Sequence, residues 1–182
     1  MTTQSAEPSA AGTPEQAAPP GKFASKAPAR AAAGTIAVAT AAAVAGLVLL
    51  VAAGETLDRT VLIPPLAASA ALVFGAPALP LSQPRSVIGG QLLSALTGFV
   101  VLAVGGSSMW AAGIAGGLAL GVMMTARTPH SPAAATAVIV VLAEPARLPF
   151  LLLLLLGTVL LVLVGLLAGR SGRTAPYPAY WW

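Results

Sequence analysis

Long uninterrupted runs of apolar residues dominate the chain between its two ends. Four runs without a charged side chain cover residues 31–54, 60–84, 86–126 and 148–169. A membrane-spanning helix needs about 20 such residues, because it must cross roughly 30 Å of hydrocarbon. The pattern therefore predicts an all-α fold, a polytopic membrane helix bundle that is surrounded mostly by lipid.

Proline, glycine and polar residues divide these runs into six expected membrane segments. The segments are residues 31–53, 64–76, 87–104, 109–125, 132–143 and 148–168. Residues 64–76 and 132–143 are short and begin with proline, which suits the first turn of a helix but breaks its interior. At 1.5 Å per residue each is about 20 Å long, so either a full crossing or a re-entrant segment fits. A count of only four spans would leave long apolar stretches exposed to water.

The flanking regions differ in composition from the expected transmembrane domain, residues 31–169. Residues 1–30 are rich in Ala, Pro, Ser and Thr and are expected to be a disordered cytoplasmic tail. Residues 170–182 form a short C-terminal tail that ends in Tyr180, Trp181 and Trp182. Two interpretations fit this tail: its aromatic residues lie at the lipid–water interface, or the tail is mobile.

The basic residues predict the orientation of the bundle. With six crossings, one side of the membrane receives seven of the nine basic residues: Lys22, Lys26, Arg30, Arg85, Arg127, Arg170 and Arg173. Arg59 and Arg147 fall on the other side, each near an acidic residue. Because positive charges favour the cytoplasmic side, both termini are expected in the cytoplasm of a multi-pass protein of the cell inner (plasma) membrane.

Composition excludes several classes of chemistry. The chain is 57% hydrophobic and 8% charged, and it has no cysteine and one histidine. It therefore has no disulfide framework, no thiol nucleophile and no sequence pattern for a metal site or cofactor, so we expect neither metal nor cofactor and no enzyme. The dispersed basic residues argue against nucleic acid as a partner. The expected partners are the lipid bilayer and a small inorganic anion.

Small residues at helical spacing predict close packing between helices. Gly113, Gly117 and Gly121 lie four residues apart in the fourth segment, a pattern that lets helices approach closely. We interpret this face as a packing device first, and it could also serve a homo-oligomer.

A weak internal repeat relates the two short segments. A shift of 67 residues places residues 65–70 over residues 132–137. Three segments in each half would run in opposite directions, which is the inverted-topology plan of many transporters. We expect the starts of the two short segments to meet at mid-depth. There their unpaired N–H groups and dipoles would form an anion site.

Three stretches of the sequence resemble the HPP family of integral membrane proteins. They are Ala68–Pro77, Ser82–Gly90 and Thr128–Ala137, and the resemblance covers about residues 55–168. The chain departs from the family by His130-Ser131-Pro132 in place of His-Pro-Pro, and by Gln91 where many relatives have histidine. The resemblance implies a multi-span protein. For plant and cyanobacterial members it implies movement of nitrite across a membrane.

The first candidate site residues lie at the expected cytoplasmic end of the third segment. Arg85 follows Gln83-Pro84. One interpretation is an anion-attracting mouth in which Gln83 supplies hydrogen bonds, an interpretation that the family resemblance strengthens. The other is a topology anchor whose side chain reaches the lipid headgroups.

The second group of candidates belongs to the two short segments. His130 is the only histidine, and it could donate to an anion or relay a proton, or it could cap local backbone. Ser131 is expected to be the N-cap of the fifth segment. Ser69 and Thr136 correspond in the repeat, so they line one pathway or hydrogen-bond between helices.

These features predict a membrane permease or channel for a small inorganic anion, with nitrite as the lead candidate. The alternative is a non-transporting membrane scaffold or partner subunit, which the sparse polar inventory and the glycine faces favour.

Overall fold

The computed structural model describes residues 29–181, and the expected all-α fold is confirmed there. Six α-helices follow one another along the chain: α1 (Ala33–Leu57), α2 (Pro64–Gly75), α3 (Gly90–Gly105), α4 (Met109–Thr125), α5 (Ser131–Ala143) and α6 (Arg147–Gly169). A 3₁₀ turn, η1 (Pro80–Ser82), and a π-helical turn, η2 (Arg85–Gly89), precede α3. Most of the expected N-terminal tail, residues 1–28, lies outside the described residues.

Three of the helical stretches are long and apolar enough to cross a membrane. They are α1, the continuous stretch Arg85–Gly105 and α6. The other three, α2, α4 and α5, are shorter apolar helices of 12, 17 and 13 residues. The six helices agree in number with the six expected segments, and multiple apolar helices mark the chain as a membrane protein.

Local sequence explains where several helices begin. Ile63 is extended, as expected of a residue before proline, and α2 starts at Pro64. The α4 helix begins after Ser108, whose hydroxyl oxygen accepts from the backbone N–H of Ala111 at 3.1 Å. The N-cap of α5 is His130 rather than the expected Ser131, which is instead the first helical residue.

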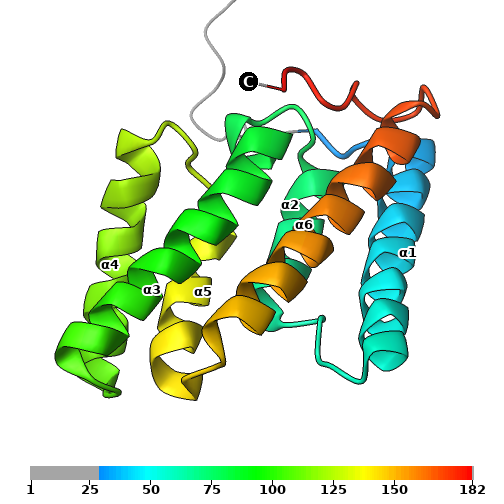
Figure 1. Cartoon of the computed structure of the whole chain (residues 1–182). Coiled ribbons are helices and arrows are strands. Elements are labelled where there is room, and N and C mark those ends of the chain that lie inside the picture. Colours follow the sequence, from blue (N-terminus) through cyan, green and yellow to red (C-terminus); the bar gives the residue numbers. More distant parts are fainter. Residues whose placement is uncertain (1–28, 182) are drawn as a thin grey trace, which may run out of the picture. The chain divides into compact units, whose positions relative to one another are not determined.

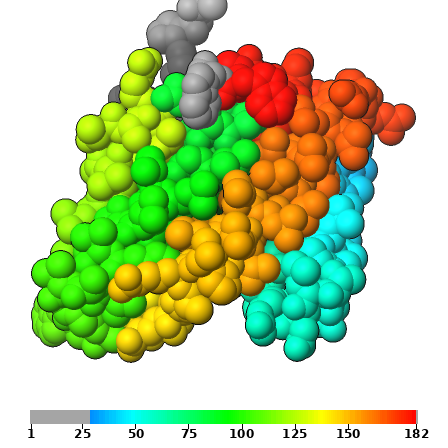
Figure 2. All heavy atoms as spheres, viewed as in Figure 1, coloured from blue at the N-terminus to red at the C-terminus, as the bar shows by residue number. Residues whose placement is uncertain are grey.

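The helices pack as two groups of three. One group is α1, α2 and α6, and the other is α3, α4 and α5. Contacts between α3 and α6 and between α2 and α5 join the groups. Figure 2 shows α3 (green) beside α6 (orange) across one face. The rings of Phe99 and Phe150 meet edge to face there, with centroids 6.0 Å apart.

Large apolar side chains cover the outward faces of the helices. Val104 on α3, Ile114 and Leu118 on α4, and Leu163 on α6 are all exposed. A soluble protein rarely exposes apolar surface on this scale, whereas a lipid-facing helix requires it.

The C-terminal tail folds back onto one end of the helices. Tyr177 is buried, and a Cβ atom added at Gly165 would lie 2.7 Å from its ring. The Thr35 hydroxyl donates to the Arg173 carbonyl at 2.7 Å, so the start of α1 and the end of α6 lie at the same end. The part of the tail that is described is therefore packed against the helices rather than detached from them.

Candidate functional site

Five uncharged polar side chains gather in the interior where α2, α3 and α5 meet. They are Ser69 on α2, Gln91 and Ser94 on α3, His130 at the start of α5 and Thr136 on α5. Each is at most 1% exposed. Because buried polar groups are costly without partners, their hydrogen bonds decide what the cluster can do.

A continuous chain of hydrogen bonds runs through four of these side chains. The Thr136 hydroxyl donates to Gln91 Oε1. Gln91 Nε2 donates to Ser69 Oγ at 3.0 Å. Ser69 Oγ lies 2.7 Å from His130 Nε2. We call these four residues, Ser69, Gln91, His130 and Thr136, the polar chain.

His130 is held on both sides of its ring. Its Nδ1 atom lies 2.7 Å from the Leu81 carbonyl oxygen, which ties the start of α5 to η1. A Cβ atom added at Gly90 would lie 2.7 Å from His130 Cβ and 2.8 Å from the Thr128 carbonyl oxygen. Glycine at position 90 therefore lets the turn before α5 approach α3 and brings the imidazole to Ser69.

The start of α5 lies inside the helical domain, and the meeting of the two helix starts at mid-depth stays a prediction. Figure 1 shows the connection from α4 running back into the domain before α5 begins. His130 meets Ser69 in the second turn of α2, not Pro64 at its start. The first two residues of α2 are prolines without an N–H, and the Leu66 N–H donates to the Ile63 carbonyl at 2.9 Å. Side chains, not bare helix ends, make this interior polar.

A second feature lies at the end of the domain that carries the basic residues. A recess of about 610 Å³ has Arg85, Arg127, Pro129 and Tyr180 in its lining. Arg85 Nη2 donates to the Ala126 carbonyl at 3.2 Å, which holds the guanidinium beside the turn before Arg127. None of the described residues that line the recess is acidic. The recess therefore brings two guanidinium groups to one end of the domain.

Gln83 does not line the recess with Arg85, although the sequence interpretation placed both residues at one anion-attracting mouth. Its side chain is buried, and Nε2 donates to the Pro77 and Leu79 carbonyls at 2.8 and 2.9 Å. Its Oε1 accepts from the Ala179 N–H at 2.8 Å. Gln83 thus holds the C-terminal tail in place.

The structure brings together three of the six predicted site residues. Ser69, His130 and Thr136 belong to the polar chain, whereas Arg85 lines the recess and Ser131 is exposed at the start of α5.

Three residues of the buried polar cluster and the arginine recess were not predicted from the sequence as site residues. Gln91 and Ser94 are buried polar residues of α3, and Arg127 lines the recess. The signal for Gln91 was available, since a glutamine inside an apolar membrane segment is costly and often functional. Ser94 donates to the Ala133 carbonyl, which fastens α3 to the first turn of α5.

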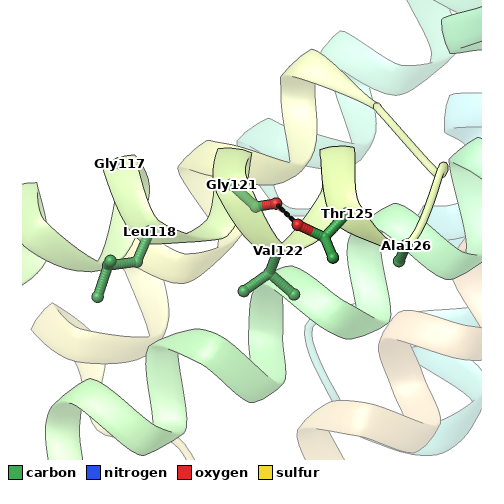
Figure 3. Close-up of a pocket in the computed structure, with 6 residues that line it drawn as sticks. All are labelled: Gly117, Leu118, Gly121, Val122, Thr125 and Ala126. Carbon is green, nitrogen blue, oxygen red and sulfur yellow. Dashed lines mark hydrogen bonds between the residues drawn. The ribbon is translucent and has the colours of Figure 1, made fainter.

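A third recess lies on the outer side of α4. It has a volume of about 560 Å³, and its lining residues are Gly117, Leu118, Gly121, Val122, Thr125 and Ala126. Figure 3 shows them on α4 and at its end, with the Thr125 hydroxyl donating to the Gly121 carbonyl at 2.8 Å. A Cβ atom added at Gly113, Gly117 or Gly121 would meet nothing within 4 Å. The predicted glycine face is therefore open.

Comparison with known proteins places these features in a family context. The sequence profile described as "HPP, transmembrane region" matches residues 28–178. A transmembrane protein of Dictyostelium discoideum is 35% identical over 138 residues, or 70% of this chain and 48% of that protein. A second one from the same organism is 32% identical over 124 residues, or 64% of this chain and 40% of that protein. The chain thus spans about half the length of these curated relatives, or less. No solved structure matches the chain.

Proposed function

This chain belongs to the HPP transmembrane family, and from that premise we propose that it is a permease or channel for a small inorganic anion, with nitrite as the lead candidate. One observation carries the proposal. A hydrogen-bonding cluster without a fixed charge is buried among apolar helices of a chain that also has a two-arginine recess at one end. Polar groups inside a membrane domain are expensive and usually serve a substrate or ion pathway.

The chemistry of the two features suits a small oxyanion. Arg85 and Arg127 raise the local concentration of anions, and a planar guanidinium matches the two oxygens of nitrite. Hydroxyl, amide and imidazole groups can then replace part of the hydration shell without holding the anion too tightly to release it. A cation is a poorer fit, because α2, α3 and α5 carry no carboxylate.

Helix packing supports six crossings built as an inverted repeat. A shift of 67 residues relates α1 to α4, α2 to α5 and α3 to α6. Exchanging each helix for its counterpart turns the group of α1, α2 and α6 into the group of α4, α5 and α3, and these are the two groups observed. The same exchange swaps α3 with α6 and α2 with α5, and these are the two pairs of helices that join the groups.

Close glycine contacts repeat with the same shift. A Cβ atom added at Gly98 would lie 2.9 Å from Val140 Cβ, and one added at Gly165 would lie 3.0 Å from Val73 Cγ1. Gly165 follows Gly98 by 67 positions, and Val140 follows Val73 by 67 positions. These matched contacts support the proposed repeat.

A second pair of glycine contacts obeys the same relation. Gly90 packs against Thr128 before α5, and its counterpart Gly157 packs against Val61 before α2. Glycines 67 positions apart therefore contact the turns that lead into the two short helices, which supports the proposed repeat.

The charge distribution supports cytoplasmic termini in a plasma membrane. Hydrogen bonds place Arg85, Arg127 and Arg173 near the same end as the start of α1. The other ends of the helices and their connections hold three acidic residues, Glu55, Asp58 and Glu144, together with two arginines, Arg59 and Arg147. By the positive-inside rule the basic end faces the cytoplasm.

Anion flux into proteoliposomes tests the proposal. The protein is expected to move nitrite faster than empty vesicles, and Arg85→Ala is expected to reduce flux about tenfold or more at low nitrite. The reason is that a hydrogen bond to a charged group is worth about 1.5–3 kcal/mol.

The matched control is Arg59→Ala, an arginine in the connection between α1 and α2 at the other end. Both variants must match the parent in gel-filtration profile. Absence of nitrite, nitrate and formate movement in the parent would reject the function, and an unchanged flux in Arg85→Ala would reject the role of Arg85.

The alternative function is a non-transporting scaffold or partner subunit, and the open glycine face of α4 favours it. Gly113, Gly117 and Gly121 leave room for a second helix to approach. If a second copy binds there, Gly117→Leu is expected to abolish cross-linked dimers in bilayers, while Leu152→Ala, on the exposed surface of α6, is expected to leave them. Equal dimer yields in both variants would contradict this interface.

A further inference from the structure

We propose that the arginine recess, the recess that Arg85, Arg127 and Tyr180 line, binds the phosphate of an anionic phospholipid, with an acyl chain of that lipid along Leu120 and Met124 of α4. The recess brings cationic, aromatic and apolar side chains together at one end of the domain. The lipid site goes beyond the proposed function and does not rest on it. If both hold, the lipid phosphate and the transported anion compete for the same guanidiniums.

Both arginines lie where an apolar helix of the domain starts or ends. The stretch that is long enough to cross a membrane begins at Arg85, and α4 ends at Thr125, two residues before Arg127. The ends of such helices lie near the boundary between hydrocarbon and headgroups. A guanidinium at this depth meets lipid phosphates, and its planar fork can bind two phosphate oxygens at once.

The turn after α4 presents the Arg127 side chain outward. The Arg127 N–H donates to the Met124 carbonyl at 3.0 Å, and its φ of 58° turns the chain out of the helix. The Arg85 guanidinium donates to the carbonyl of the preceding residue, Ala126, at 3.2 Å, so both arginines belong to one turn. The Arg127 side chain is exposed, and within residues 29–181 it has no hydrogen-bond or ion-pair partner. Its guanidinium is therefore available to a ligand.

The apolar part of the recess leads from the arginines along α4. Leu120 and Met124 lie four residues apart, so their side chains share one face of the helix. At 1.5 Å per residue, Leu120 lies about 6 Å further from the end of the helix than Met124. Both side chains are exposed, at 51% and 63%. They offer an acyl chain a continuous wall, whereas a free inorganic anion gains nothing from them.

The C-terminal tail supplies the aromatic side chain of the recess. Gln83 Oε1 accepts from the backbone N–H groups of Ala179 and Tyr180 at 2.8 and 3.4 Å. Gln83 is itself buried, and its Nε2 donates to two backbone carbonyls, so the tail is fixed where Tyr180 lines the recess. Tyrosine suits a membrane interface, because its ring packs against apolar groups and its hydroxyl can donate to a phosphate or ester oxygen.

The charge of the recess selects the kind of headgroup. Phosphatidylcholine carries a cation beside its phosphate, and two guanidiniums repel that cation. Phosphatidylglycerol has an uncharged glycerol in the same place and a net negative charge. We therefore expect the recess to prefer phosphatidylglycerol to a zwitterionic lipid of the same chain length.

A general attraction between the basic end and anionic lipids is the alternative to a specific site. Arg173 provides the comparison, because it is exposed near the same end of the domain but does not line the recess. General attraction predicts that Arg127 and Arg173 contribute equally to lipid binding. A site in the recess predicts that Arg127 contributes more.

Native mass spectrometry of the full chain in detergent measures which lipids stay bound. The chain is offered equal amounts of phosphatidylglycerol and phosphatidylcholine of different mass, and the parent is expected to retain phosphatidylglycerol. Arg127→Gln should lower this retention about fivefold, the effect of one basic residue near an anionic membrane surface. Arg173→Gln should match the parent. Gel-filtration profiles that match the parent check that both variants fold.

A second pair of variants tests the wall for the acyl chain. Met124→Ser should also lower retention of phosphatidylglycerol. Met109→Ser changes another exposed methionine, at the opposite end of α4, and should leave retention unchanged. Inorganic phosphate at the same concentration as the lipid distinguishes the two sources of a phosphate group, and it is expected to leave the lipid bound.

Four results would overturn the inference. They are equal retention of the two lipids by the parent, equal losses in Arg127→Gln and Arg173→Gln, equal retention in Met124→Ser and Met109→Ser, and release of the lipid by inorganic phosphate, which would indicate a site for free anions. Lipid retention is measured without flux. Failure of nitrite transport would therefore leave this inference standing, and failure of lipid selectivity would leave the permease to its own test.

Discussion

At the scale of single residues, the glycines on the inner faces matter as much as the polar side chains. Gly90 and Gly98 let α3 approach the start and the body of α5, so that Gln91 reaches both Ser69 and Thr136. An added methyl group would separate the helices that carry the polar chain.

The first prediction concerns Gly98→Ala. The new Cβ would lie 2.8 Å from the Ala137 carbonyl oxygen, and such overpacking costs about 1–3 kcal/mol. We expect a lower midpoint of thermal unfolding in detergent. The control is Gly113→Ala, where a Cβ meets nothing within 4 Å and where alanine favours the helix. Equal midpoints for the two variants would show that α3 and α5 do not pack this closely.

At the scale of elements, the backbone at the start of α5 suits both the family's His-Pro-Pro and the His130-Ser131-Pro132 of this chain. Ser131 is the first residue of the helix, where the N–H has no partner within the helix, and His130 already has the extended conformation that precedes proline. The family motif therefore fits this backbone, although the chain carries serine.

The second prediction is that Ser131→Pro is tolerated. Proline suits the first helical position, and it is expected to leave stability unchanged or to raise it by about 0.4–1 kcal/mol. Ala133→Pro is the contrasting variant, because it removes the N–H that donates to the His130 carbonyl at 2.9 Å in a buried position. A loss of folded protein in Ser131→Pro comparable to that in Ala133→Pro would contradict this account of the turn.

At the scale of the whole molecule, the two ends of the helical domain differ in the charges that they carry. Arg85, Arg127 and Arg173 lie at one end, where Gln83 and Thr35 also fix the C-terminal tail. The connection from α3 to α4 lies at the other end, with the acidic connections.

The third prediction uses the absence of native cysteine. Ser107→Cys, between α3 and α4, and Ser171→Cys, after α6, are both exposed positions. In intact cells a membrane-impermeant thiol reagent should label the first variant and reach the second only after lysis. Labelling of both from outside, or of Ser171→Cys alone, would refute the six-crossing orientation.

Much of the fold could be predicted because its signals are local. The bounds of α4 and the start of α2 follow from Gly-Gly-Ser-Ser and Pro-Pro boundaries, and the family follows from short sequence blocks. The candidate site was predicted less completely. Ser69, His130 and Thr136 were named, but Gln91 between them was not, and Gln83 and Ser131 have positions away from the polar chain.

The sequence by itself determined that the chain is a membrane protein of apolar helices, because run length and proline position act within each segment. The tertiary structure alone decided which polar atoms meet. Ser69 reaches Gln91 across 22 positions and His130 across 61, and such contacts depend on how each helix is rotated about its axis. Glycines on the inner faces set that rotation by allowing close approach at only a few points, which run lengths do not encode.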